Sequence, residues 1–230
     1  GLKRRRRTLE APCGPLAIID GRELISFCSN DYLGLANEPA LIEAAAEADA
    51  AVKAAQAAQP EWAMMGMPAR RHCLANLAEA LDRYTGHFAK LLVQECGFDE
   101  ARATAEVGEA VAALQGASVG QTGVVGIVLD DSRPLGNFAE AMAPALMAGA
   151  AVVVKPSPKA PSAVYALCEL SSRAEWPAGV LNLMQGDAAA IAGLCSGGVD
   201  RLVFSGHAAL GVQVGAIAEA AGTPFEMKAA

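Results

Sequence analysis

The feature that most constrains the fold is a regular alternation of short apolar runs and helical patterns in the second half of the chain. The runs, mostly apolar and often β-branched, are residues 124–129, 151–154, 180–183, 201–204 and 224–227. Helical patterns lie near residues 136–148, 161–174, 187–195 and 208–221. This alternation is typical of βαβ units, in which each helix returns the chain to a neighbouring parallel strand. Because such crossovers are right-handed, we expect helices on both faces of one sheet.

The sequence of the first half of the chain predicts one short hairpin followed by helices. Two apolar runs, residues 16–20 and 23–27, adjoin Asp20-Gly21, a dipeptide that favours a tight turn between antiparallel strands. Alanine- and glutamate-rich residues 39–58 predict a helix that Pro60 closes. Further helices are expected at residues 68–86, 88–96 and 100–115, with a stop at Gly97.

Together these patterns predict an α/β protein. We expect a Rossmann-like parallel sheet of about five strands, an N-terminal helical layer and a small N-terminal β-ribbon. The expected units are an N-terminal segment with the ribbon, a helical layer and an α/β unit, at residues 1–46, 47–115 and 120–230. With 53% hydrophobic residues the chain can bury a real core, and residues 1–46 should be dispensable for it.

Charge and cysteine placement argue against several classes of partner. The net charge is −7, and the five basic residues at positions 3–7 favour a solvated start over a nucleic-acid-binding arm, because no interleaved aromatics follow. No stretch is uniform and long enough to span a bilayer, so we expect no membrane partner. The six cysteines and three histidines are scattered without metal-like spacing. We expect reduced thiols, no metal and a cytoplasmic protein.

Several strings in the second half carry a resemblance through their order and spacing. They are Gly123-Val124-Val125-Gly126, Gly186-Asp187 and the stretches at residues 143–150, 153–157, 177–182 and 199–206. This ordered set resembles the aldehyde dehydrogenase family. The helices from about residue 50 to residue 114 also resemble the N-terminal helical layer of that family, so the likeness covers about four-fifths of the chain.

The start of the chain resembles a different family. Arg5-Arg6-Arg7-Thr8, Asp20-Gly21-Arg22 and residues 27–36 (FCSNDYLGLA) resemble the beginning of 8-amino-7-oxononanoate synthase, a pyridoxal-phosphate enzyme. By that resemblance, the lysine that holds its cofactor belongs to a large domain with no counterpart in these residues. The junction between the two resemblances falls near residues 44–49.

The aldehyde dehydrogenase resemblance implies a dinucleotide site at the ends of two strands. Lys155 and Ser157 match a string that binds the adenosine ribose, but Pro158 replaces its glutamate and leaves Lys155 and Lys159 facing that region. A solvated lysine at a strand end is the alternative for Lys155. Without the acid, we expect weak binding of NADP or NAD, with NADP preferred.

The second part of the implied site is the loop that would bind the pyrophosphate. It comprises Phe204, Ser205, Gly206, His207 and Gly211, with Gly186 as a further backbone turn. His207 stands where the family has a hydroxyl residue at a helix N-terminus, and the imidazole either donates to phosphate or is only a surface residue. The short glycine-rich link at residues 116–123 lacks the family's longer arm between subunits, which leaves the protein partner or oligomer unknown.

The catalytic positions of the family are poorly matched. Asp130-Asp131-Ser132-Arg133-Pro134 replaces a string that holds an oxyanion-stabilising asparagine. Glu226 matches the general base, with a strand-end carboxylate as the alternative interpretation. By resemblance the catalytic cysteine would come later than residue 230, and none of the six cysteines takes its place.

We therefore expect a catalytically incomplete nucleotide-binding unit that is inactive as a lone chain. Two alternatives stay open. One is a structural or interaction module that has lost the cofactor, and the other is a fragment of a pyridoxal-phosphate-dependent acyltransferase of the 8-amino-7-oxononanoate synthase type.

Overall fold

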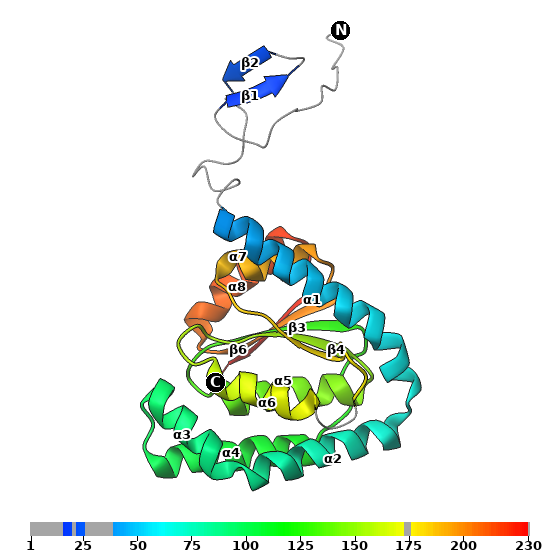
Figure 1. Cartoon of the computed structure of the whole chain (residues 1–230), viewed down its shortest axis with the longest axis vertical. Helices are drawn as coiled ribbons and strands as arrows, with labels where there is room; N and C mark the ends of the chain where they lie inside the picture. The colour runs from blue at the N-terminus through cyan, green and yellow to red at the C-terminus, as the bar shows by residue number, and fades with distance from the viewer. Residues whose placement is uncertain (1–15, 20–21, 26–38, 173–175, 230) are drawn as a thin grey trace.

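The computed structural model describes residues 16–19, 22–25, 39–172 and 176–229. Its largest part is a parallel sheet between layers of helices (Figure 1). The strands are β3 (Val124–Leu129), β4 (Ala151–Lys155), β5 (Leu181–Leu183), β6 (Arg201–Gly206) and β7 (Phe225–Ala229). Their order is β5-β4-β3-β6-β7, and every pairing is parallel. The predicted α/β fold with about five parallel strands is confirmed.

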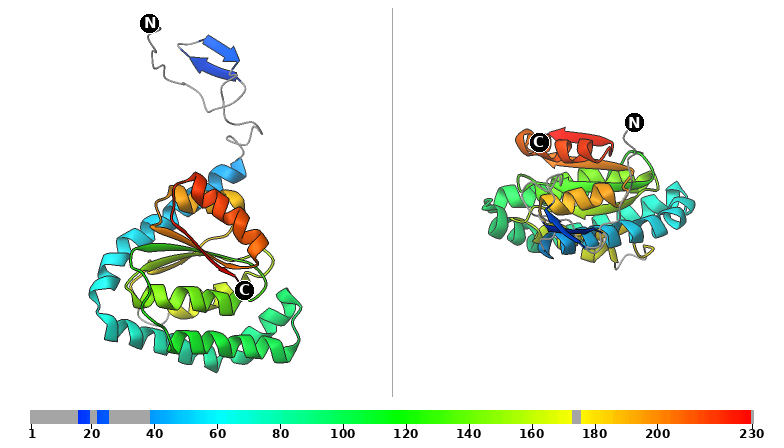
Figure 2. Two further views of the ribbon diagram at one scale, coloured as in Figure 1. Left: turned by 180° about the vertical axis from the view of Figure 1, so that it is seen from behind. Right: turned by 90° about the horizontal axis from the view of Figure 1, so that it is seen from above.

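Helices cover both faces of the sheet, as right-handed crossovers require. One face carries α5 (Pro134–Met147) and α6 (Ser162–Ser172), and the other carries α7 (Ala188–Ser196) and α8 (Ala208–Ala220). The view from behind in Figure 2 shows α8 on the same face as α7. Beyond α5 and α6 lies a further layer, formed by α2 (Met67–Arg83), α3 (Thr85–Cys96) and α4 (Glu100–Gln115).

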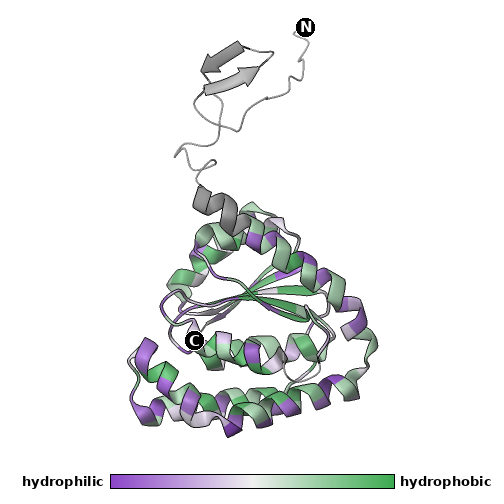
Figure 3. Ribbon diagram, viewed as in Figure 1, coloured by the Kyte–Doolittle hydropathy of each residue, from purple (hydrophilic) through white to green (hydrophobic). Residues whose placement is uncertain are grey.

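Alternation along β3 divides the core in two. Val125, Ile127 and Leu129 point into the cluster under α5, whereas Val124 and Val128 point into the cluster under α7 and α8. All six residues of β3 are buried, as expected for a central parallel strand covered on both faces. Hydropathy colouring shows the same concentration of apolar residues in the sheet (Figure 3).

The first helix, α1 (Pro39–Met64), corrects one expectation. Pro60 was expected to close it, yet the helix continues for four more residues with the proline inside. Pro60 is exposed, so the carbonyl that it leaves without a helical partner can bond to water. Beyond it, buried Trp62 donates to the carbonyl of Leu146 over 3.0 Å, and this anchor on α5 holds the last turn in place.

The remaining boundaries agree closely with the sequence patterns. Gly97 ends α3 in the left-handed conformation, with φ of 68°, as the predicted stop requires. At the N-terminus β1 (Leu16–Ile19) pairs antiparallel with β2 (Arg22–Ile25). Residues 20–21 lie outside the described residues, so the turn between these strands stays a prediction. Within the described ranges, no helix combines the length and apolarity needed to cross a membrane.

Candidate functional site

The strand order places a topological switch point between β3 and β6. From β3 the chain proceeds through α5 to β4 on one side, and it later returns to β6 on the other side. Ligands of open parallel sheets bind in the crevice at the carboxyl ends of strands where the order reverses in this way. The residues that follow these two strands are Asp130 and His207.

Asp130 fills the space between the two strand ends. Its side chain is only 3% exposed. Oδ2 accepts from the backbone N of His207 over 2.6 Å and lies 2.7 Å from Nδ1 of the same residue. Oδ1 accepts from the N and Oγ of Ser132 over 3.0 and 2.5 Å. Burial raises the pKa of Asp130, but these hydrogen bonds outweigh burial and hold the pKa below its usual range.

Gly206 makes this close approach feasible. Its φ of 151° is a conformation that side chains rarely adopt, and a Cβ there would overlap the carboxyl group of Asp130. The next glycine, Gly211, packs in the same way against Phe204 and Met227. Close packing therefore explains why glycine stands at both positions of the predicted pyrophosphate loop, whether or not a ligand binds there.

The end of β4 holds the predicted ribose site. Lys155 is 3% exposed, and its Nζ donates to the carbonyl of Pro156 over 3.1 Å. Burial lowers the pKa of Lys155, against the opposing effect of Asp187. Ser157 is also buried and accepts from the backbone N of Lys159 over 3.3 Å.

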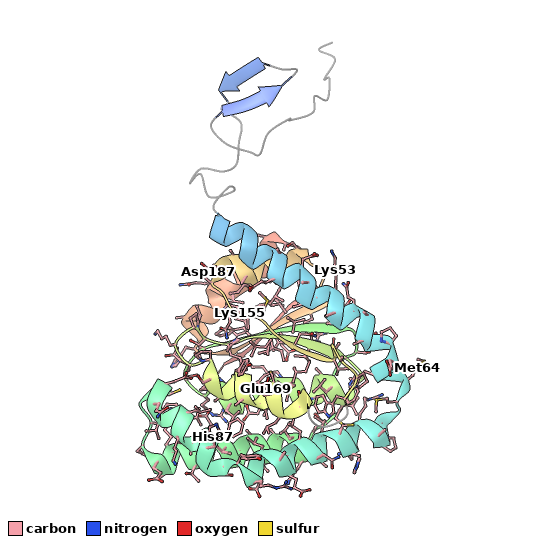
Figure 4. The ribbon with its side chains drawn as sticks, in the orientation of Figure 1. Lys53, Met64, His87, Lys155, Glu169 and Asp187 are labelled. Atoms are coloured by element: carbon pink, nitrogen blue, oxygen red, sulfur yellow. The ribbon has the colours of Figure 1, made fainter. Side chains whose placement is uncertain are left out.

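The two lysines of this strand end do not converge. Figure 4 shows Lys155 near Asp187, the residue that caps α7. Lys159 has a side chain that is 78% exposed, and its Nζ lies 3.7 Å from Asp131 in the loop after β3. Each lysine therefore has a different carboxylate near it.

Carboxylates also meet the N-termini of the helices at this edge of the sheet. Buried Glu106 on α4 accepts from the N of Leu135 and Gly136 on α5, over 2.9 and 3.2 Å. Glu95 on α3 accepts from the N and Oγ of Ser162 on α6. Asp187 accepts from Ala189 on α7 over 2.9 Å. Helix N-termini attract anions, and here the chain supplies them itself.

Glu226 lies away from this edge. It is the second residue of β7 and stands opposite Val203, whereas the residue opposite Gly206 is Ala229. Three residues of a strand span about 10 Å. Its carboxylate contacts Arg201 over 3.3 Å. The structure does not bring Glu226 together with the other predicted residues.

Sequence reasoning noted Asp130 only as the loss of an oxyanion donor and did not foresee its contact with His207. No local pattern signals that contact, because the two residues are 77 positions apart. Gly186, with φ of 126°, forms the predicted turn. The next residue, Asp187, was part of the string that carried the resemblance but was not predicted as a site residue.

The described thiols are poor candidates for nucleophiles. Burial, followed by nearby carboxylates, raises the pKa of Cys96 to about 11 and that of Cys168 to about 12. Burial also raises the pKa of Cys195. A reactive cysteine needs a lowered pKa at an exposed, electropositive position. Among the described residues, no group of three or more histidine, cysteine or acidic side chains could hold a metal.

Comparison with known proteins identifies the family. The protein-family model described as "Aldehyde dehydrogenase family" matches residues 40–229 of the chain. The chain belongs to the aldehyde dehydrogenase family. A curated relative, N-succinylglutamate 5-semialdehyde dehydrogenase of Chromobacterium violaceum, is 33% identical over 192 residues, covering 73% of this chain and 39% of the relative.

Solved structures of the aldehyde dehydrogenase family share the fold. A putative aldehyde dehydrogenase from Burkholderia cenocepacia superimposes with a TM-score of 0.72 at 28% identity, over 80% of this chain and 42% of that one. An NADP-dependent enzyme of E. coli does so with a TM-score of 0.74 at 26% identity, over 80% and 44%. The chain thus spans less than half the length of these relatives.

The N-terminal likeness to a second family is also confirmed. The 8-amino-7-oxononanoate synthase of Herminiimonas arsenicoxydans is 69% identical over 48 residues, which are 21% of this chain and 12% of that enzyme. The helix α1, which begins at Pro39, runs without a break through the predicted junction at residues 44–49.

Proposed function

We propose that the α/β unit binds a dinucleotide weakly, that it prefers NADP to NAD, and that the 230 residues do not oxidise aldehydes by themselves. The observation that carries the proposal is buried Lys155 at the carboxyl end of β4, followed by Pro158 instead of an acid. An acidic residue at this position would accept from a free 2′-hydroxyl and repel a 2′-phosphate.

The residues fit the two ends of a dinucleotide unequally. Lys155 offers positive charge for a ribose phosphate, whereas Lys159 lies near Asp131 and contributes only if its exposed side chain turns toward the ligand. Charge-assisted bonds are about twice as strong as neutral ones. At the N-terminus of α8, where a pyrophosphate would bind, the Asp130 carboxylate already accepts from His207. Similar solved structures of an NADP-dependent enzyme and of an NAD-dependent aldehyde dehydrogenase support a dinucleotide as the ligand class.

The proposed inability to oxidise aldehydes is supported by the chemistry of the described side chains. Burial and nearby carboxylates raise the pKa of the Cys96 thiol to about 11 and that of the Cys168 thiol to about 12, far above neutrality. In the loop after β3, Asp130 and Asp131 would oppose a developing oxyanion. Glu226 pairs with Arg201 instead of facing the strand ends.

Calorimetric titration of both cofactors at low salt tests the proposal. We expect a dissociation constant for NADP between about 1 µM and 1 mM, which corresponds to about 8 to 4 kcal/mol. Lys155→Ala should weaken NADP binding by about tenfold, because it removes one charge-assisted contact. Lys53→Ala is the matched control, since Lys53 is an exposed lysine on α1 that pairs with Asp49.

Three results would contradict the proposal: tighter binding of NAD than of NADP, no loss with Lys155→Ala, or aldehyde-dependent formation of reduced cofactor. Absence of any dinucleotide binding would favour the second candidate, a structural module that keeps the fold without the ligand. The observation in favour of that candidate is that carboxylates of the chain itself already accept hydrogen bonds at the N-termini of α5, α6, α7 and α8.

A further inference from the structure

At the switch point, one side chain links the ends of β3 and β6. Asp130 extends from the end of β3 to the start of α8 and contacts both the backbone and the ring of His207. We propose that Asp130 acts as an internal anion, which occupies the phosphate position at the N-terminus of α8 and limits the affinity for any phosphate ligand. This inference rests on the proposed dinucleotide function and names the residue that controls it.

The position of Asp130 is built by several independent features. Ser132 holds the Oδ1 atom with both its backbone N and its hydroxyl. Gly206 leaves room for the Asp130 carboxyl group, because the Cβ of any other residue at this position would overlap it. The Asp130 side chain is almost wholly buried, yet its hydrogen bonds hold the pKa of the carboxyl group below its usual range and so favour the charged form. A carboxylate accepts hydrogen bonds from the same donors as a phosphate oxygen and therefore competes with it.

The geometry makes this competition direct. Oδ2 lies 2.6 Å from the backbone N of His207, the residue that caps α8, so a phosphate oxygen cannot take the same donor while Asp130 holds it. A phosphate placed beside the carboxylate would also meet a like charge where little water screens the repulsion. Binding of a phosphate at this donor therefore requires the carboxylate to leave, and binding beside it is opposed while the carboxylate is charged.

A purely structural role for Asp130 makes a different prediction. If the carboxylate only fastened two loops together, its removal would loosen the loops and leave phosphate affinity unchanged or lower. If it is an internal anion, its removal raises phosphate affinity. The sign of the change therefore separates the two roles.

The test is calorimetric titration of the full chain with inorganic diphosphate and, separately, with NADP. We expect Asp130→Ala to bind diphosphate at least about tenfold more tightly than the wild type, because it frees the backbone N and the ring of His207 and removes a like charge. Asp130→Asn keeps the shape and removes the charge, so its gain should be smaller. Glu79→Ala removes an exposed carboxylate on α2, away from α8, and it should stay within about threefold of the wild type.

Thermal melts accompany each titration. If Asp130→Ala does not melt cooperatively, Asp130→Asn and Asp130→Ser decide the question, with a gain in diphosphate affinity still expected. Equal affinity in the wild type and all Asp130 variants would overturn the inference, as would an equal gain with Glu79→Ala. A gain for diphosphate without any NADP binding would support the inference and contradict the proposed function. NADP binding to the wild type without a gain in the variants would do the reverse.

Discussion

At the residue scale, Lys155 shows how a strand-end lysine can be retained in a position with little water. It is 3% exposed, its Nζ contacts one carbonyl, and burial lowers its pKa from 10.5. A lysine with a lowered pKa costs stability while it is charged. That cost is relieved as the pH rises through the folded pKa, and it vanishes above the unfolded pKa.

We therefore expect Lys155→Met to be as stable as the wild type at pH 7, or more stable by about 1 kcal/mol. The difference should shrink as the pH rises from 7 toward 10.5, the ordinary pKa of a lysine, because the folded wild type loses its proton before the unfolded chain does. Urea unfolding across this pH range measures it. Lys53→Met, at an exposed position on α1, is the control and should show no such trend. A destabilisation above about 2 kcal/mol would mean that the ammonium group is satisfied in the fold.

At the element scale, the start of α5 depends on a residue of another helix. Glu106 of α4 accepts from Leu135 and Gly136, two backbone donors that the first turn cannot satisfy itself. Burial raises the pKa of Glu106 despite these hydrogen bonds and nearby Arg133. The charged form therefore costs stability, and this cost is relieved as the pH falls through the folded pKa.

Substitution of Glu106 should separate its acceptor role from its charge. Glu106→Gln keeps an acceptor and should change the free energy of unfolding by less than about 1 kcal/mol, whereas Glu106→Ala should cost about 2 to 3 kcal/mol. Chemical denaturation at pH 7 compares them. Glu109→Ala on the same helix is the control, since the half-exposed Glu109 side chain pairs with Arg133. It should cost under about 1 kcal/mol. Equal losses for the two alanine variants would refute this role of Glu106.

At the scale of the whole molecule, α1 joins the N-terminal segment to the α/β unit. Ala48, Val52 and Trp62 on this helix are fully buried, and α1 packs on α7 and β4. The buried contacts begin at Ala48 among the residues whose side chains are described. The core should therefore need α1 from about that point onward.

A chain that begins at Glu47 should melt cooperatively, with a Tm within about 4 °C of the full chain, which corresponds to less than about 1 kcal/mol. A chain that begins at Ala54 lacks Ala48 and Val52 and should melt at a clearly lower temperature, because their burial under α7 is lost. Differential scanning calorimetry compares the two. Loss of cooperative melting in the longer chain would show that residues 1–46 are integral to the core.

The sequence alone determined the elements of this protein, because their signals are local. The run from Val124 to Leu129 coincides with β3, and Gly97 ends α3 as expected. Pro60 did not end its helix, since the anchor of Trp62 on Leu146 comes from a helix far along the chain. Tertiary structure alone decided what fills the helix N-termini: Glu106, Glu95 and Asp130 lie 29, 67 and 77 positions from their partners. Periodicity predicts where a helix begins, but only the packed fold determines which distant carboxylate reaches that beginning.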